Sequence, residues 1–257
     1  MASDSSNMIL ASTLIIARDG NAGGPELLML ERSSGMRFAA GALVFPGGRL
    51  DDVDLALAAE LGNGRPEPIE DIASRIAAIR ETIEETGIAV GLDPVPDTAT
   101  IMMLREALAG GASFATLIAE AGLRLDLDEM ALFARWQPPH GVAHRRFDTR
   151  FYVAPAPADA VELADGTENV RAFWATAESI LADARAGHHT IIFPTICTLF
   201  RLAQLSSFED IAHDADRHGQ HLAATEIIER DGGRWFTIPG DIGFPVNSLL
   251  DGLLPLD

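Results

Sequence analysis

Residues 80–88 read Arg-Glu-Thr-Ile-Glu-Glu-Thr-Gly-Ile, and a Phe-Pro-Gly-Gly turn precedes them at 45–48. Glu81, Glu84 and Glu85 stand at positions i, i+3 and i+4, so on a helix their side chains share one face. Because three neighbouring carboxylates repel one another, such a cluster raises its own pKa values or binds a cation. Carboxylate oxygens at this spacing suit Mg²⁺ or Mn²⁺ better than zinc. The pattern therefore predicts an acidic helix beside a glycine turn and favours a divalent metal site.

The same segment carries the features of a helix over roughly 68–86. Isoleucines three or four residues apart form an apolar stripe nearly opposite the glutamates, at positions 69, 72, 76, 79 and 83. Pro68 suits the first turn, and Gly87 suits a left-handed C-terminal cap. Arg80 reaches Glu84 at i+4, so it can hold a carboxylate in place without binding the metal.

Acidic runs on amphipathic helices are usually solvated faces, and an isolated Glu-Glu pair would favour that interpretation. The glycine turn changes the balance, because turn and helix together resemble the Nudix hydrolase signature. Asp54 stands at its first acidic position and Thr82 at a position that is usually hydrophobic. The matching residues are Gly48, Arg80, Glu81, Glu84, Glu85, Gly87 and Ile88.

The resemblance implies an α/β Nudix-type α/β/α sandwich with a mixed sheet, and hydrolysis of a pyrophosphate bond with Mg²⁺ or Mn²⁺ as cofactor. It assigns the metal to Glu81, Glu84, Glu85 and the carbonyl of Gly48 or its neighbour Gly47. Glu81, assisted by Arg80, is the first choice for the general base. Glu168, on a later loop, is the alternative base or ligand.

The interval between Gly48 and Arg80 is longer than in the compact signature, which places an insertion at about 55–73. We expect it to loop out at the surface, since the entropy of loop closure grows slowly with length. Residues 27–51 also look like the region found in coenzyme A diphosphatases, especially the organellar branch, whose signature carries an insertion. Residues 134–138 and 145–152 are similar to the same branch, and the resemblance covers roughly 10–205.

This branch implies coenzyme A or acyl-coenzyme A as substrate, held by Arg32, Arg37, Arg49, Arg145 and Arg146. Ala39 and Ala42 stand where bacterial coenzyme A diphosphatases have His and Gln. Two alternatives therefore stay open: a pyrophosphatase of ADP-ribose or nucleotide sugars, and a non-catalytic ligand sensor with the same fold.

The net charge of −19 argues against general binding to nucleic acids or anionic membranes, both of which need a basic surface. All 19 basic residues are arginines, which suit bidentate contacts to phosphate. The densest basic cluster comprises His140, His144, Arg145, Arg146 and Arg150. We expect a small nucleotide-type substrate as partner and leave a homodimer open.

Other metal sites and other compartments are less favoured. Cys197 is the sole cysteine, which rules out an intramolecular disulfide and a zinc-thiolate cluster. His213, His218 and His221 do not share a helical face as zinc ligands would. The N-terminal residues carry no basic segment before an apolar run that suits a strand, and the cytoplasm is the expected compartment.

Residues 1–205 are expected to form the Nudix domain, with insertions at about 55–73 and 97–130, and residues 206–257 an extension packed on it. The second insertion is expected to be helical, and Asp231-Gly232 to form a hairpin turn. Strands are predicted near 11–18, 27–32, 42–45, 131–136, 147–154 and 169–174, and further helices near 113–121, 176–186 and 195–205.

Overall fold

The computed structural model describes residues 8–20, 24–36, 39–140 and 146–252. Arg37, His144 and Arg145, which the sequence analysis singled out, lie outside these ranges.

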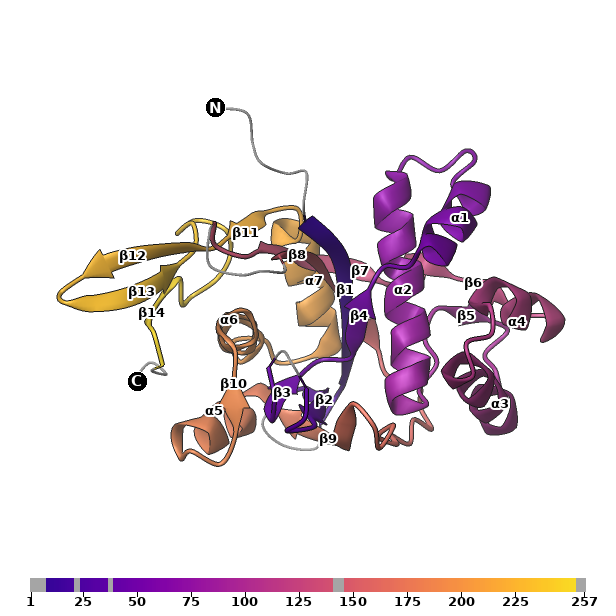
Figure 1. Cartoon of the computed structure of the whole chain (residues 1–257), viewed down its shortest axis with the longest axis horizontal. Coiled ribbons are helices and arrows are strands. Elements are labelled where there is room, and N and C mark those ends of the chain that lie inside the picture. The colour runs from indigo at the N-terminus through magenta and orange to yellow at the C-terminus, as the bar shows by residue number, and fades with distance from the viewer. Residues whose placement is uncertain (1–7, 21–23, 37–38, 141–145, 253–257) are drawn as a thin grey trace.

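A nine-stranded mixed sheet forms the centre of the described chain (Figure 1). Its order is β10-β3-β2-β1-β8-β7-β11, with β4 paired to β1 and β9 paired to β2. The central strand β1 runs parallel to β8 and antiparallel to β2 and β4. The strands are β1 (Met8–Arg18), β2 (Glu26–Arg32), β3 (Ala42–Val44), β4 (Gly47–Arg49), β7 (Ala131–Gln137), β8 (Arg146–Pro155), β9 (Asn169–Thr176), β10 (Thr190–Ile191) and β11 (Leu222–Ala224). The six predicted strands are thereby confirmed, with ends shifted by at most three residues.

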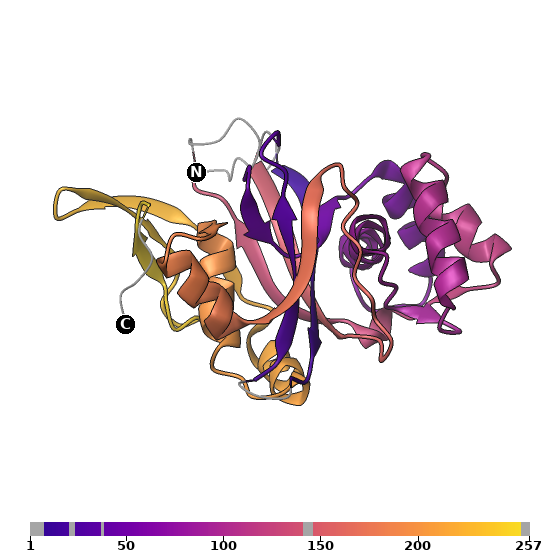
Figure 2. The same cartoon turned by 90° about the horizontal axis from the view of Figure 1, so that it is seen from below.

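Helices cover both faces of the sheet, as the alternation of apolar residues along β1 requires. Leu14 and Ile16 belong to the apolar core on one face, and Ile15 and Ala17 to the core on the other. Figure 2 shows α2 (Ile69–Thr86) on the first face, with α1 (Asp52–Leu61), α3 (Thr98–Ala109) and α4 (Phe114–Glu120) outside it. On the second face lie α5 (Ala177–Arg185), α6 (Phe193–Leu202) and α7 (Phe208–His218). The predicted α/β sandwich is confirmed.

Helix α2 begins directly after Pro68 and ends at Gly87, whose φ of 66° is the left-handed cap expected from the sequence. The stripe of isoleucines is buried from Ile72 to Ile83. Ile69, in the first turn, is the exception: its side chain is 40% exposed. The predicted stripe is therefore one residue too long.

The first insertion does not loop out, and that prediction was wrong. Residues 52–61 form helix α1 (Asp52–Leu61), and residues 69–73 are the first turns of α2. Ala58 of α1 is fully buried in the core cluster that contains the isoleucines of α2, so burial of apolar surface compensates the ordering of the segment. Asp51 and Asp54 close the N-terminus of α1 in a reciprocal capping box.

The second insertion is helical as predicted. It contains α3 (Thr98–Ala109) and α4 (Phe114–Glu120), followed by a 3₁₀ turn (Leu127–Glu129). A short two-stranded sheet, β5 (Leu92–Asp93) with β6 (Arg124–Leu125), brackets the two helices.

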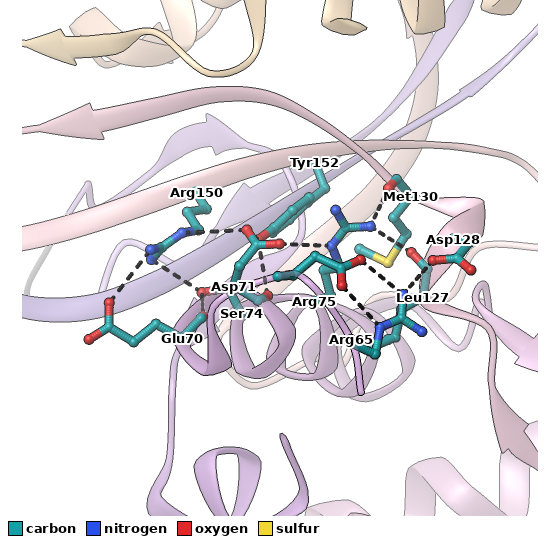
Figure 3. Close-up of polar contacts among 11 residues, drawn as sticks. Arg65, Glu70, Asp71, Ser74, Arg75, Leu127, Asp128, Met130, Arg150 and Tyr152 are labelled. Carbon is teal, nitrogen blue, oxygen red and sulfur yellow. Dashed lines mark hydrogen bonds and ion pairs between the residues drawn. The ribbon is translucent and has the colours of Figure 1, made fainter. Parts of the chain in front are cut away.

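Polar contacts fasten the first turns of α2 to β8 and to the end of the second insertion (Figure 3). The hydroxyl of Tyr152 donates to Asp71 Oδ1 at 2.7 Å, and Arg75 Nε donates to the other oxygen at 3.2 Å. Arg75 Nη1 also donates to the carbonyls of Leu127 at 2.7 Å and Met130 at 2.6 Å. Since Tyr152 and Asp71 are both largely buried, this cluster fixes where α2 crosses the sheet.

Helices α5 and α6 precede residue 205, and the chain beyond it extends the main sheet and adds a second sheet. Helix α5 (Ala177–Arg185) and helix α6 (Phe193–Leu202) are present as predicted, and α7 (Phe208–His218) and β11 follow. The buried Arg201 donates to Asp214 Oδ2 at 2.6 Å and to the carbonyl of Phe133 at 2.9 Å, which joins α6, α7 and β7. Cys197 lies in the same core and is fully buried.

A separate three-stranded sheet projects to one side in Figure 1. It consists of β12 (Glu226–Arg230), β13 (Gly233–Thr237) and β14 (Ser248–Leu250). The predicted hairpin turn at Asp231-Gly232 joins its first two strands. Within the described ranges, none of the helices has the length and apolar character needed to span a bilayer.

Candidate functional site

The glycine turn and the acidic helix are in direct contact. Gly47 has φ of 150°, and a Cβ there would lie 2.2 Å from the carbonyl oxygen of Ser12 on β1. A Cβ at Gly48 would lie 2.4 Å from the carboxyl carbon of Glu81. Only glycine therefore lets β4 pass between β1 and the Glu81 side chain. The predicted juxtaposition of the turn with the carboxylate helix is confirmed.

Arg80 donates hydrogen bonds to three carboxylates, those of Asp54, Glu81 and Glu84. Its guanidinium donates to both oxygens of Asp54, at 3.1 and 2.9 Å, and both side chains are almost completely buried. Its Nη1 donates to Glu81 at 2.8 Å and to Glu84 at 3.1 Å, as the i+4 spacing predicted for Glu84. Burial disfavours the charged guanidinium, but Asp54 and Glu81 outweigh it and raise the pKa of Arg80. Asp54 thus anchors the arginine, and the arginine holds Glu81 and Glu84.

The three glutamates differ in environment more than the sequence suggested. Glu84 and Glu81 keep contact with solvent, whereas Glu85 is buried between α2 and the sheet. Burial raises the pKa of Glu81 to about 7 and that of Glu85 to about 8, although the Arg80 guanidinium opposes the shift at Glu81. Glu85 is the most buried of the three because the last turn of α2 packs against the glycine turn.

Glu85 is held from two sides by groups far away in the sequence. Its Oε2 accepts the Gly47 N–H at 2.8 Å, and its Oε1 accepts from Asn169 Nδ2 at 2.9 Å. Asn169 is fully buried at the start of β9. Sequence reasoning missed this residue, although it directly follows Glu168 in the turn Asp-Gly-Thr-Glu-Asn.

Asp165 shapes the turn that brings Asn169 to the site. Its Oδ1 accepts the backbone N–H groups of Thr167 and Glu168, both at 2.7 Å, and its Oδ2 accepts from Asn169 Nδ2 at 2.7 Å. Burial alone would raise the pKa of Asp165, but the hydrogen bonds from Thr167 and Asn169 hold it below its usual range. The turn is therefore stabilised by an ionised carboxylate.

Glu168 lies at the edge of the site and is exposed. Its Oε2 is 3.6 Å from Arg32 Nη2, and its carbonyl accepts the Ser33 N–H at 2.7 Å. Arg32, at the end of β2, is largely buried, and its Nε has no hydrogen-bond partner in the described chain. Both predicted residues thus border Asn169 and Glu85, paired with each other.

The remaining predicted substrate residues lie farther out. Arg49 follows Gly48 directly, is exposed, and pairs with Asp51 at 3.2 Å. Arg146 begins β8 and lies 3.2 Å from His140 Nδ1. Gly48 pairs with Ser12 on one side of β1, and Arg146 pairs with Met8 on the other side. Four residues along the strand and two strand spacings across the sheet therefore put their Cα atoms roughly 16 Å apart. Strand alternation places Arg146 on the same face as Arg150, whose guanidinium lies 3.7 Å from Asp71 on α2.

The donor set suits a divalent cation, although the carboxylates are engaged with other partners. No three Asp, Glu, His or Cys side chains of the described ranges are already arranged around a metal position. Arg80 holds Glu81 and Glu84, while Gly47 and Asn169 hold Glu85. Two partly desolvated carboxylates with raised pKa values nevertheless favour a cation, and oxygen donors fit Mg²⁺ or Mn²⁺. The residues present therefore fit such an ion chemically.

Comparison with known proteins agrees with this geometry. No family model matches the chain. Acyl-coenzyme A diphosphatase NUDT19 of Gallus gallus is 27% identical over 72% of this chain, and its counterpart in Xenopus laevis is 25% identical over 91%. The chain spans 63% of the length of the chicken relative and 75% of the frog relative.

A solved structure shares the fold. The crystal structure of a Nudix hydrolase from Alicyclobacillus acidocaldarius superimposes with a TM-score of 0.68 at 27% identity, and the match covers 80% of this chain and 95% of that one. The glycine turn, the carboxylate helix and the sandwich thus agree with these relatives, and the chain resembles Nudix hydrolases, in particular the coenzyme A diphosphatase branch.

Proposed function

We propose that the protein is a Mg²⁺-dependent enzyme that cleaves the pyrophosphate bond of a nucleoside diphosphate linked to another moiety. The observation that carries the proposal is the contact between the Gly47-Gly48 turn and the carboxylates of Glu81 and Glu85. This contact gathers oxygen donors where β4 meets the last turn of α2, near arginines that suit phosphate.

The protein side chains have distinct roles in this proposal. Glu81, Glu84, Glu85 and the Gly48 carbonyl would hold the cation. When bound, the cation supplies positive charge that offsets the charge of the pyrophosphate and polarises water. Arg80, clamped by Asp54, keeps Glu81 and Glu84 in place.

Glu81 is our first choice for the general base. Its pKa of about 7 lies near neutral pH, where a base combines availability with proton affinity. Glu168 is the second choice. Its exposure and its position beside Asn169 support this second choice, but its pairing with Arg32 favours a role in presenting that arginine.

Coenzyme A or an acyl-coenzyme A is the substrate we favour. The two relatives named above are acyl-coenzyme A diphosphatases, and Arg32 and Arg49 flank the site. Coenzyme A carries a 3′-phosphate that ADP-ribose lacks. Arg146, on the face of the sheet covered by α2, could bind that group through charge-assisted hydrogen bonds.

ADP-ribose or a nucleotide sugar is the second candidate. Ala39 and Ala42 favour it, since bacterial coenzyme A diphosphatases have His and Gln there. A sensor without turnover is less favoured, because all three signature glutamates are retained.

Initial rates with Mg²⁺ on coenzyme A, dephospho-coenzyme A and ADP-ribose distinguish these proposals. We expect the highest kcat/KM for coenzyme A, and loss of its advantage over the dephospho form in Arg146→Ala. Arg124→Ala is the control, since Arg124, in the second insertion, is exposed and pairs with the exposed Asp93. Faster turnover of ADP-ribose than of coenzyme A by the unmodified protein would assign the second candidate instead.

A further inference from the structure

We infer that Asn169 is a positioning residue for the candidate metal site, acting through the carboxylate of Glu85. The inference rests on the proposed function, because it concerns how the chain prepares Glu85 for a divalent cation. Asn169 lies outside the Nudix signature and reaches Glu85 from a different part of the chain.

The side-chain amide of Asn169 binds one specific oxygen of the Glu85 carboxylate. Its Nδ2 lies 2.9 Å from Glu85 Oε1, while Gly47 N–H occupies Oε2. The carboxylate is therefore fixed in plane by one donor from β4 and one from β9. Because Asn169 is fully buried, water cannot replace its amide at this point.

The orientation of the amide follows from its partners. Nδ2 donates to Glu85 and also to Asp165 Oδ2 at 2.7 Å, so both of its hydrogens face carboxylates. The flipped amide would place Oδ1 against two acceptors, which would repel it. The Asn169 backbone N–H also lies 3.2 Å from Asp165 Oδ2, so the turn fixes the residue at both main chain and side chain.

The acceptor end of the amide is buried and unpaired. Asn169 Oδ1 has no hydrogen-bond partner in the described chain, and neither has Nε of Arg32, its register neighbour on β2. Buried polar atoms without a partner are uncommon in folded proteins. Asn169 thus links the Asp165 turn to Glu85 and lies beside Arg32 in the sheet register.

Groups that orient metal ligands typically change metal affinity or activity by about 10–100-fold when removed. A residue that served packing alone would instead change stability and leave metal affinity unaltered. Asn169→Leu separates the two roles, because leucine has a similar shape and no donor. Asn169→Ala is the second variant, and Asn247→Leu, in the C-terminal segment away from the site, is the matched control.

Mn²⁺ binding, measured by electron paramagnetic resonance without substrate, is the primary readout. We expect the dissociation constant to rise about 10–100-fold in Asn169→Leu and Asn169→Ala, and to stay unchanged in Asn247→Leu. Wild-type affinity in folded Asn169→Leu, with only a lower Tm, would overturn the inference and leave the proposed function intact. Absence of Mn²⁺ binding to the wild type would overturn both.

The wild type offers a test that does not depend on the variants folding. In protein labelled with ¹⁵N-asparagine, the side-chain amide resonance of Asn169 should shift as Mg²⁺ is added, while that of Asn247 should not. An Asn169 signal that stays fixed while Mg²⁺ binds would contradict the inference.

Discussion

Removal of the Asp54 carboxylate should destabilise the protein strongly, because Asp54 neutralises a buried arginine. The Asp54 side chain is 1% exposed and the Arg80 side chain 8% exposed, and two hydrogen bonds of 3.1 and 2.9 Å join them. Asp54 Oδ2 additionally accepts the Asp51 N–H at 2.9 Å and so caps α1. Asp54→Ala therefore removes one charge of a buried pair and a helix cap together.

The magnitude follows from the charge left behind. Breaking a buried ion pair by removing one partner costs about 3–5 kcal/mol, since the remaining charge stays desolvated. For a chain of this size that corresponds to a fall in Tm of roughly 6–20 °C. Glu81 and Glu84 contact only Nη1, so they cannot fully replace the two bonds to Asp54.

Urea unfolding of the metal-free protein, followed by circular dichroism, measures the effect. Asp183→Ala is the control: this helical carboxylate is half exposed, lies 3.5 Å from His188, and should change stability by less than about 1 kcal/mol. The double variant Asp54→Ala/Arg80→Ala should lose less than the sum of its single variants. A loss in Asp54→Ala no larger than the control's would refute the view that Asp54 anchors Arg80.

Three further predictions follow from the site and its support. Glu84→Gln should abolish hydrolysis while Tm stays within a few degrees of the wild type, since Glu84 is partly exposed and its loss removes metal charge rather than packing; near-native rates would remove Glu84 from the site. In metal-free protein, the free energy of unfolding should fall as pH rises from about 5 to about 8. The reason is that burial in the folded state raises the pKa of Glu81 to about 7 and that of Glu85 to about 8, above their ordinary value of 4.5. Added Mg²⁺ should therefore stabilise the protein more at pH 8 than at pH 6, and equal Tm shifts at both pH values would contradict this assignment. Tyr152→Phe should cost about 1–3 kcal/mol in urea unfolding through loss of its bond to Asp71, yet leave the Mn²⁺ dissociation constant unchanged; a weakened constant would show that this cluster also supports the site.

The features predicted correctly from the sequence are those that short-range periodicity determines. The span of α2, its Gly87 cap and the reach of Arg80 to Glu84 all depend on residues within one or two turns of each other. The insertion before α2 was misjudged because its length was considered without its apolar residues, among them the buried Ala58.

The arrangement around Glu85 could not be predicted in the same way. The spacing of the three glutamates on α2 does not show which of them the glycine turn covers. In the structure the turn covers Glu85, which is buried. Asn169 is 84 positions away from Glu85, so their contact depends on how β9 pairs with β2 across the sheet. An asparagine after a turn carries no local signal of such a role.

Phosphorus-31 magnetic resonance of coenzyme A incubated with the wild-type protein tests the central claim most directly. With Mg²⁺, we predict that the pyrophosphate resonances disappear and that two new phosphomonoester resonances arise beside that of the 3′-phosphate. With a chelator in place of Mg²⁺, the spectrum should not change. If the pyrophosphate resonances persist with Mg²⁺, for coenzyme A and equally for ADP-ribose, the carboxylate face of α2 is not the hydrolytic centre that we propose.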